Sequence, residues 1–287
     1  MVAFEDGRVC SQANQIYLNH MFKKTIKSLL AHPLTHGLDI DSPEMTIRRS
    51  RIIQQKAFLK CFYQKCYLAI AESLPNSING PVLEIGSGAG FLKECISGLL
   101  TSEILHIPGV DVICDGQKLP FKSVSLRGIV MLDVLHHIPC VKKFLSTAAH
   151  CVKPGGAIVM IEPWNTRWSK FVYKHLHHEP FDQKASEWDL PSSGPLSQAN
   201  SALPWIIFER DREVFEQEFP VWQLKKTSLH SPLSYLLSGG ISYRVSLPSI
   251  LFKTCNHFED CLTPWIESWA MFATIVLIRR SNGLYRN

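Results

Sequence analysis

The sequence predicts an α/β fold built on a parallel, doubly wound sheet. Apolar segments with strand character begin near residues 82, 99, 110, 128 and 157, and segments with helical spacing separate them. This alternation is typical of strand–helix–strand units, which cover both faces of a sheet with helices. Ligands of such sheets bind beyond the carboxyl ends of the strands, so the functional residues are expected there.

A glycine-rich turn follows the first predicted strand. Residues 82–85 are mostly apolar strand formers, and Gly86, Gly88 and Gly90 come next at every second position. Without a Cβ atom, such a turn can adopt positive φ and lie against a ligand. The dinucleotide fingerprint G-x-G-x-x-G is not met, because Phe91 stands at its third position. A nicotinamide-dependent reductase is therefore disfavoured, and a turn without a ligand is the alternative if the motif is taken alone.

Acidic residues occur in or directly after the predicted strands. Glu84 lies within the first strand, Glu103 and Asp115 close the next two, and Asp133 follows the fourth. An ionised carboxylate offers two acceptor oxygens, so Glu103 could bind both hydroxyls of a ribose. An acid exposed at the surface is the alternative for Glu103. Because the carboxyl ends of parallel strands meet at one edge, these acids are expected to share one site.

Several motifs together resemble the class I S-adenosylmethionine (SAM) methyltransferases, in particular their type 11-like group. They are E-x-G-x-G-x-G from Glu84, D-G-Q-K-L-P-F over 115–121, L-H-H-I over 135–138 and V-K-P-G-G over 152–156. The resemblance is firm from about 80 to 164 and extends by architecture to about 280. It implies a Rossmann-like, seven-stranded sheet whose last strand, near 272–278, is antiparallel and lies beside a sixth strand at 221–228.

The resemblance also implies SAM as the cofactor and assigns roles to residues. Asp115 would bind the adenine amino group, the N–H of Gly116 would face the ring, and Asp133 would lie beside the methionine end. The predicted cofactor-binding residues are Glu84, Gly86, Ser87, Gly88, Gly90, Glu103, Asp115, Gly116 and Asp133.

Residues 164–204 are rich in aromatic and histidine side chains and are expected to form a lid over the acceptor. His177, His178 and Asp133 are the predicted catalytic residues, since a base is useful when the acceptor is a hydroxyl or a protonated amine. The neighbouring Glu179 completes a polar group with the two histidines. A metal ion held within 175–179 is the weaker alternative, and no metal is predicted.

The predicted domains are an N-terminal helical extension over 1–78 and a SAM-binding domain over 79–280, with the lid at about 164–204. The extension is expected to contain helices near 13–31 and 41–72. The second helix would begin with Asp41 as its N-cap and Glu44 three residues later, a capping-box pattern. A further helix is expected over 204–219.

Composition limits the partners and the cellular location that can be expected of the protein. The net charge is +5 in 287 residues and no dense basic run occurs, so no nucleic-acid partner is predicted. The nine cysteines include no C-x-x-C pair, which favours reduced, buried thiols and a cytoplasmic location. The longest apolar run, 270–278, is far below the ~20 residues that span a bilayer, so stable membrane insertion is not expected. The sequence leaves the oligomeric state open.

These observations predict a methyltransferase that acts on a small or amphiphilic, lipid-like acceptor. A catalytically silent SAM-binding scaffold or regulatory partner is the alternative. Binding of SAM is expected in both cases, so turnover is the property that separates them.

Overall fold

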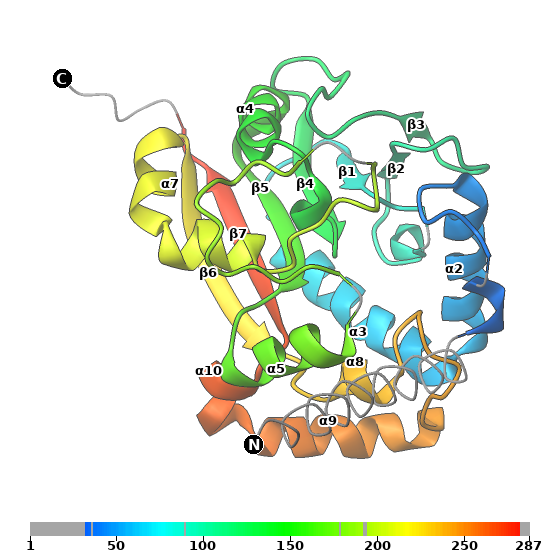
Figure 1. The fold of residues 1–287 in the computed structure, drawn as a ribbon. Coiled ribbons are helices and arrows are strands. Elements are labelled where there is room, and N and C mark those ends of the chain that lie inside the picture. The colour runs from blue at the N-terminus through cyan, green and yellow to red at the C-terminus, as the bar shows by residue number, and fades with distance from the viewer. Residues whose placement is uncertain (1–31, 36, 89, 178, 192–193, 282–287) are drawn as a thin grey trace, which may run out of the picture.

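The computed structural model describes residues 32–281 except 36, 89, 178 and 192–193. Its centre is a seven-stranded sheet of order β3-β2-β1-β4-β5-β7-β6 (Figure 1). The strands are β1 Val82–Ile85, β2 Leu99–Glu103, β3 Val112–Ile113, β4 Leu126–Leu132, β5 Val152–Pro163, β6 Trp222–His230 and β7 Phe272–Arg279. Strands β1 to β5 pair in parallel, and β7 is antiparallel to both β5 and β6. The predicted Rossmann-like sheet with an antiparallel last strand is confirmed.

Helices cover both faces of this sheet and the ends of its strands (Figure 1). The α-helices are α2 Pro43–Gln55, α3 Ala57–Ser73, α4 Val141–Cys151, α5 Arg167–Leu176, α6 Leu203–Trp205, α7 Arg212–Glu218, α8 Ser234–Leu237, α9 Phe252–Cys261 and α10 Ile266–Trp269. Shorter helical turns are η1 Pro33–Thr35, η2 Leu92–Glu94, η3 Leu135–His137, η4 Ile206–Arg210, η5 Ser249–Leu251 and η6 Thr263–Trp265.

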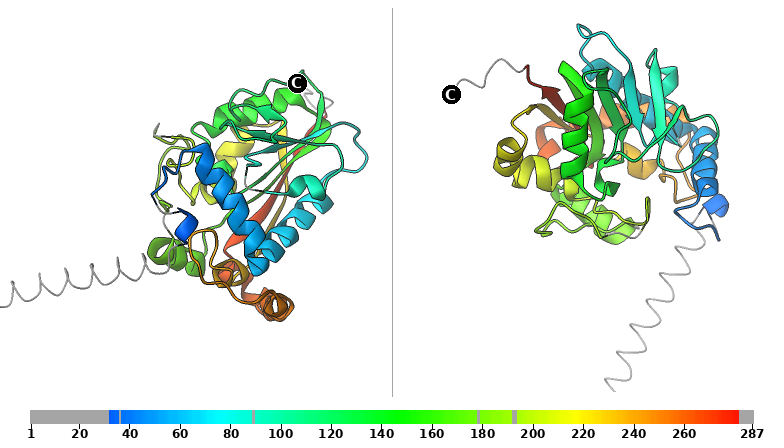
Figure 2. Two further views of the ribbon diagram at one scale, coloured as in Figure 1. Left: turned by 90° about the vertical axis from the view of Figure 1, so that its right-hand side faces the viewer. Right: turned by 90° about the horizontal axis from the view of Figure 1, so that it is seen from above.

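Two apolar cores hold the layers together, one on each face of the sheet. On β4, Ile129 packs in the core that contains α4, whereas its neighbour Val130 packs in the core that contains α3. The side view in Figure 2 shows α3 and α4 on opposite sides of the strands. Burial on both faces explains why the central strands are continuous apolar runs rather than alternating ones.

The helix expected over 41–72 is two helices, because Lys56 interrupts it in an extended conformation. The Nζ atom of Lys56 donates hydrogen bonds to the carbonyl oxygens of Gly240 (2.5 Å) and Tyr243 (2.8 Å). The N-cap of α2 is also not Asp41 but Ser42, whose hydroxyl accepts the N–H of Met45. The break therefore fastens the two helices to the turn after α8.

The third strand is shorter than the expected 110–115. The side chain of Asp111 accepts the backbone N–H and the hydroxyl of Thr101 and binds Lys93. Because the Thr101 N–H donates to the side chain of Asp111 and not to a backbone carbonyl of the third strand, only Val112 and Ile113 pair with β2. Asp111 is thus a structural residue.

The segment after the glycine turn forms the single helical turn η2, and one other predicted helix differs from expectation. The helix over 204–219 is divided into α6, η4 and α7, with a break at Asp211, whose N–H bonds the carbonyl of Ile206. The helix predicted near 13–31 lies outside the described residues.

The described cysteines are all free thiols. Cys66, Cys151 and Cys255 are buried as predicted, whereas Cys95 and Cys261 are exposed. No helix in the part of the chain that the structure describes has both the length and the apolar character needed to span a bilayer.

Candidate active site

A cavity of about 420 Å³ opens beyond the carboxyl ends of β1, β2 and β4. The order of the sheet reverses between β1 and β4, and such a switch point is where ligands of open parallel sheets bind. The predicted residues that line this cavity are Glu84, Gly86, Gly90, Glu103, Asp115, Gly116, Asp133 and His177. The acids at four strand ends therefore do meet in one place.

The glycine turn is shaped by its missing side chains. Gly86 has φ +71°, and a Cβ atom there would lie 2.6 Å from a methyl carbon of Val134. A Cβ atom on Gly90 would lie 2.2 Å from the hydroxyl oxygen of Tyr67. Either contact is far below van der Waals distance, so only glycine leaves this part of the cavity open.

Ser87 and Gly88 are not among the lining residues but support them. The Ser87 hydroxyl donates to the carbonyl of Glu84 (3.3 Å) and accepts the N–H of Ser102 (3.1 Å). The N–H of Gly88 donates to Oε2 of Glu103 at 3.2 Å. The turn therefore ties β1 to β2 and orients the acid at the end of β2.

The two glutamates of this region have different settings. Glu84 is 4% exposed, and burial, together with the charge of Glu103, raises its pKa to about 7 although the Ser87 hydrogen bond opposes the shift. Glu103 is held by the N–H groups of Gly88 and Ile104, the second at 2.9 Å. A carboxylate fixed in this way is available to accept hydrogen bonds from hydroxyl groups in the cavity.

The other predicted acids are also held by backbone geometry. Asp115 accepts the N–H of Gln117 at 2.8 Å, which fixes the turn that carries Gly116. Asp133 has φ +63°, a strained conformation for a residue other than glycine, and its N–H donates to the carbonyl of Ile161. Burial raises the pKa of Asp133 to about 7, and nearby acids add to this while His136 opposes it.

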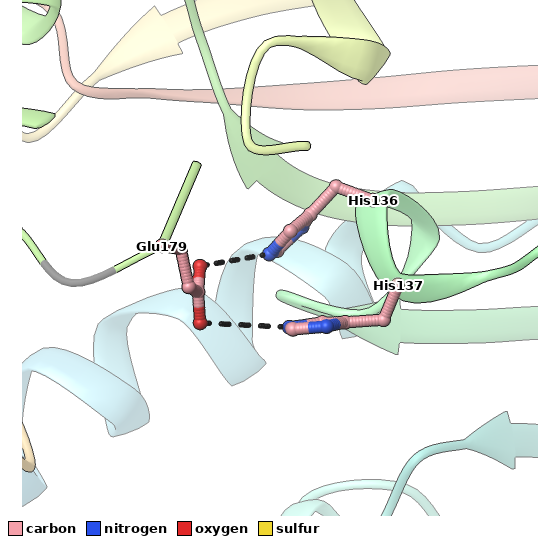
Figure 3. A group of neighbouring side chains, drawn as sticks. All are labelled: His136, His137 and Glu179. Carbon is pink, nitrogen blue, oxygen red and sulfur yellow. Dashed lines mark hydrogen bonds and ion pairs between the residues drawn. The ribbon is translucent and has the colours of Figure 1, made fainter. Parts of the chain in front are cut away.

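A polar cluster that the sequence did not predict as a unit lies beside Asp133, although the turn histidines His136 and His137 are possible bases by residue type. His136 is fully buried, and its Nδ1 atom lies 2.8 Å from Oε2 of Glu162. Its Nε2 atom lies 3.3 Å from Oε2 of Glu179, which comes from the segment after α5 (Figure 3). Burial lowers the pKa of His136, but the hydrogen bonds to Glu162 and Glu179 outweigh it and raise the pKa well above its usual value.

His137 joins the same cluster from the other side. Its Nδ1 atom bonds the carbonyl oxygen of Gln198 at 2.9 Å, and its Nε2 atom lies 3.6 Å from Oε1 of Glu179 (Figure 3). Burial and the neighbouring His136 lower the pKa of His137 to about 4. His137 and Glu179 both line the cavity, so the cluster reaches the ligand space.

Of the predicted catalytic histidines, His177 lines the cavity and His178 lies outside the described residues. The Nδ1 atom of His177 accepts the N–H of Glu179 and lies 3.8 Å from Oε2 of that residue. Glu162 could have been found from the sequence, because it lies near the carboxyl end of β5 as the other acids lie at or near the ends of their strands. The pairing of Glu179 with His136 and His137 has no signal in the sequence.

Residues from outside the sheet close the cavity. Helix α2 contributes Thr46 and Arg49, helix α3 contributes Tyr63 and Tyr67, and helix α8 contributes Tyr235.

The loop after α5 contributes Pro195, Leu196 and Gln198. The loop is attached to the N-terminal region, because Oδ1 of Asp41 accepts the N–H groups of Leu196 (2.6 Å) and Ser197 (2.9 Å).

The donor set suits SAM. The turn that lacks side chains leaves room for a ligand against the backbone, and the carboxylates that line the cavity can accept hydrogen bonds from hydroxyl groups and attract a positive charge. The residues present therefore fit the cofactor that the sequence predicted.

Comparison with known proteins agrees with this fit. The family model described as "Methyltransferase domain" matches residues 56–205, more than half of the chain. The mouse (Mus musculus) tRNA (carboxymethyluridine(34)-5-O)-methyltransferase ALKBH8 is 22% identical over 161 residues. The match covers 54% of this chain but only 22% of the mouse protein.

Solved structures with a similar fold include two methyltransferases. Geranyl diphosphate C-methyltransferase from Streptomyces coelicolor A3(2) has 9% sequence identity and a TM-score of 0.48, with 87% of this chain and 89% of that chain covered. Phosphoethanolamine N-methyltransferase 2 from Haemonchus contortus has 12% identity and a TM-score of 0.40, with 76% and 53% covered. These likenesses are distant, and the assignment rests on the family model. This chain belongs to the family of SAM-dependent methyltransferases, and its cofactor is SAM, as its sequence predicted.

Proposed function

We propose that the protein transfers the methyl group of SAM to a small or amphiphilic acceptor bound in the same cavity. One observation carries this proposal. Acids suited to the cofactor (Glu84, Glu103 and Asp115) and a second group of polar and aromatic residues around His177 and Tyr235 line a single cavity of about 420 Å³. Cofactor and acceptor can therefore share one enclosed space.

The cofactor side is proposed to use the predicted residues. Glu103, fixed by two N–H groups, accepts the ribose hydroxyls, and Asp115 accepts the adenine amino group beside Gly116. Glu84, when ionised, faces the positive charge of the methionine portion. SAM supplies a methyl group on a positively charged sulfur, from which an acceptor displaces it in line.

The protein's own contribution is then alignment of the acceptor and exclusion of water. Asp133 stands at the carboxyl end of β4, and His177 enters from the loop after α5, so both line the space where an acceptor would meet the methyl group. We propose that Asp133 and His177, with the neighbouring His178, orient the acceptor and take up its proton where it has one.

The lining also indicates the chemical class of the acceptor. Among the described residues that line the cavity, Arg49 is the only lysine or arginine, whereas five are acids: Glu84, Glu103, Asp115, Asp133 and Glu179. A polynucleotide needs several phosphate contacts from basic residues. Three tyrosines also line the cavity, Tyr63, Tyr67 and Tyr235, and they favour an acceptor with an apolar part, so the proposal is a neutral or cationic small molecule. The mouse relative is named for a reaction on tRNA, which makes a nucleoside acceptor a necessary arm of the test.

The test combines binding with turnover. Calorimetric titration with SAM and with S-adenosylhomocysteine (SAH) is expected to show binding of both, and no binding of NAD. SAH formation is then followed with amines, small hydroxylated compounds, lipid-like amphiphiles and nucleosides as acceptors. Binding without turnover on any acceptor would support the silent scaffold instead.

Variants separate alignment from cofactor binding. Asp133→Asn and His177→Gln are expected to lower turnover by about 10²–10⁴-fold, the range for a positioned acid or base. His177→Gln should lower SAH affinity much less, whereas Asp133→Asn also touches the cofactor side and should lower both. His150→Gln, on the exposed side of α4, is the matched control and should behave like the parent. Unchanged turnover in both site variants would refute the assigned roles.

A further inference from the structure

We propose that His136, His137 and Glu179 bind one divalent transition-metal ion in the wall of the cavity. Two imidazole Nε2 atoms and one carboxylate converge there from two separate parts of the chain (Figure 3). The candidate ligand atoms lie within 4.8 Å of one another.

The first argument is the direction in which each imidazole is fixed. The Nδ1 atom of His137 faces the carbonyl oxygen of Gln198, which can only accept, so Nδ1 carries the hydrogen. The Nδ1 atom of His136 likewise faces a carboxylate oxygen of Glu162. In metal sites, ligating histidines almost always donate their other N–H to a carboxylate or a backbone carbonyl. Both histidines here have that support, and both point Nε2 at Glu179.

The second argument concerns the way in which His137 faces Glu179. His137 with its hydrogen on Nδ1 presents the lone pair of Nε2 toward Oε1 of Glu179, and a carboxylate oxygen is also an acceptor. A cation between these two atoms would be attracted to both.

The third argument is distance. A charge-assisted N–H···O bond measures about 2.7–2.9 Å, and the contact of His136 with Glu162 (2.8 Å) has this length. The contacts of His136 and His137 with Glu179 are longer, at 3.3 and 3.6 Å. The two contacts reach different oxygens of Glu179, Oε2 and Oε1, so the carboxylate faces both imidazoles, and neither contact has the length of a charge-assisted hydrogen bond.

The outer contacts complete the site. Oε2 of Glu179 accepts the hydroxyl of Ser201 at 3.0 Å, and Oε1 of Glu162 accepts the N–H groups of Val134 (2.9 Å) and Leu135 (2.7 Å). Hydrogen bonds of this kind hold ligand carboxylates and the carboxylates behind ligand histidines in orientation. Two nitrogens and one carboxylate suit zinc or ferrous ions rather than magnesium or calcium.

The position of the site suggests its use. His137 and Glu179 line the cavity, so a bound ion would keep a coordination position directed at the acceptor space. Three protein ligands with an open position are typical of catalytic rather than structural metal sites. There the ion would bind an oxygen, nitrogen or sulfur atom of the acceptor. This use rests on the proposed function, whereas the metal site itself does not.

The experiment uses the full chain after chelation and buffer exchange. Cobalt(II) is titrated and its visible d–d absorption recorded, and zinc is then added as competitor. We expect one cobalt ion per chain, displaced by one zinc ion. His137→Gln removes a ligand and should weaken binding on the order of 100-fold or more, since loss of an outer partner alone costs about 10–100-fold. Glu179→Gln should weaken binding as well.

Two controls make the result decisive. His150→Gln should bind cobalt like the parent chain. SAH titration of the same samples reports the cofactor half independently, so loss of metal binding and failure of the proposed function can be distinguished. Absence of stoichiometric cobalt binding in the parent chain would overturn the proposal. Equal affinity of the parent and the two ligand variants would do the same.

Discussion

Replacement of Glu103 by glutamine tests the cofactor side of the cavity most directly. The side chain is 8% exposed, so solvent screens its interactions little. Glutamine keeps the shape and one acceptor oxygen but replaces the other oxygen with an amino group. That amino group must replace either the oxygen that accepts the N–H of Gly88 or the oxygen that accepts the N–H of Ile104, and in both cases one charge-assisted acceptor is lost.

The magnitude follows from one such hydrogen bond. Hydrogen bonds to charged groups contribute about 1.5–3 kcal/mol. With 1.4 kcal/mol for each factor of ten, Glu103→Gln should weaken SAM and SAH binding by about 10- to 150-fold. The dissociation constants are measured by calorimetric titration at one pH and ionic strength, and the melting temperature is recorded to show that the variant folds.

Glu94→Gln is the matched control, because Glu94 is exposed on the short helical turn η2.

A second readout comes from Glu84, whose raised pKa is partly caused by the charge of Glu103. The glutamine variant should therefore lower the pKa of Glu84 from about 7. If SAH affinity in Glu103→Gln equals that of the parent chain, the assignment of the β2 acid to the ribose is wrong.

Three further predictions concern the same half of the cavity. Asp115→Ala should weaken SAM binding by about tenfold or more, as loss of a charged acceptor does, whereas replacement of the exposed Asp260 by alanine should not; equal affinities would contradict the third-strand assignment. Gly90→Ala forces a methyl group against the hydroxyl of buried Tyr67. It should therefore lower the free energy of unfolding, measured by urea titration, by about 1–3 kcal/mol and also reduce SAM affinity. Values equal to those of the parent chain would show that the turn can relax. Glu84 holds its proton up to about pH 7 in the folded chain. Its contribution to the free energy of unfolding therefore falls as pH rises from its ordinary pKa of 4.5 through 7. SAM affinity should rise over the upper part of that range, because the carboxylate ionises there. Glu84→Gln should flatten that affinity profile, and an unchanged profile would exclude Glu84 as its source.

The sequence determined the sheet and the glycine turn at its edge because both depend on local pattern. Apolar runs fixed the strands, and Gly86 and Gly90 are recognisable because their turn tolerates no side chain. Once the strands are parallel, topology alone brings their carboxyl ends together, so Glu84 and Asp115 could be assigned to one cavity without coordinates.

Local pattern failed where a distant contact decides the conformation. The periodicity over 41–72 predicts one helix, but the side chain of Lys56 bonds carbonyl groups near residue 240 and the helix breaks there. The strand predicted over 110–115 is cut short because Asp111 takes the N–H of Thr101. In both cases a side chain competes with the backbone for hydrogen bonds, which no local propensity expresses.

The polar cluster was decided by the tertiary structure alone. Glu179 meets His136 across 43 positions of the chain, and the loop that carries Glu179 is held in place partly by Asp41, which binds Leu196 from 155 positions away. These contacts depend on how the loop after α5 folds back over the strand ends. The sequence thus determined the strand ends and the glycine turn that line the cavity, whereas the tertiary structure decided which loop side chains join them, because a loop without periodic pattern acquires its path only from long-range contacts.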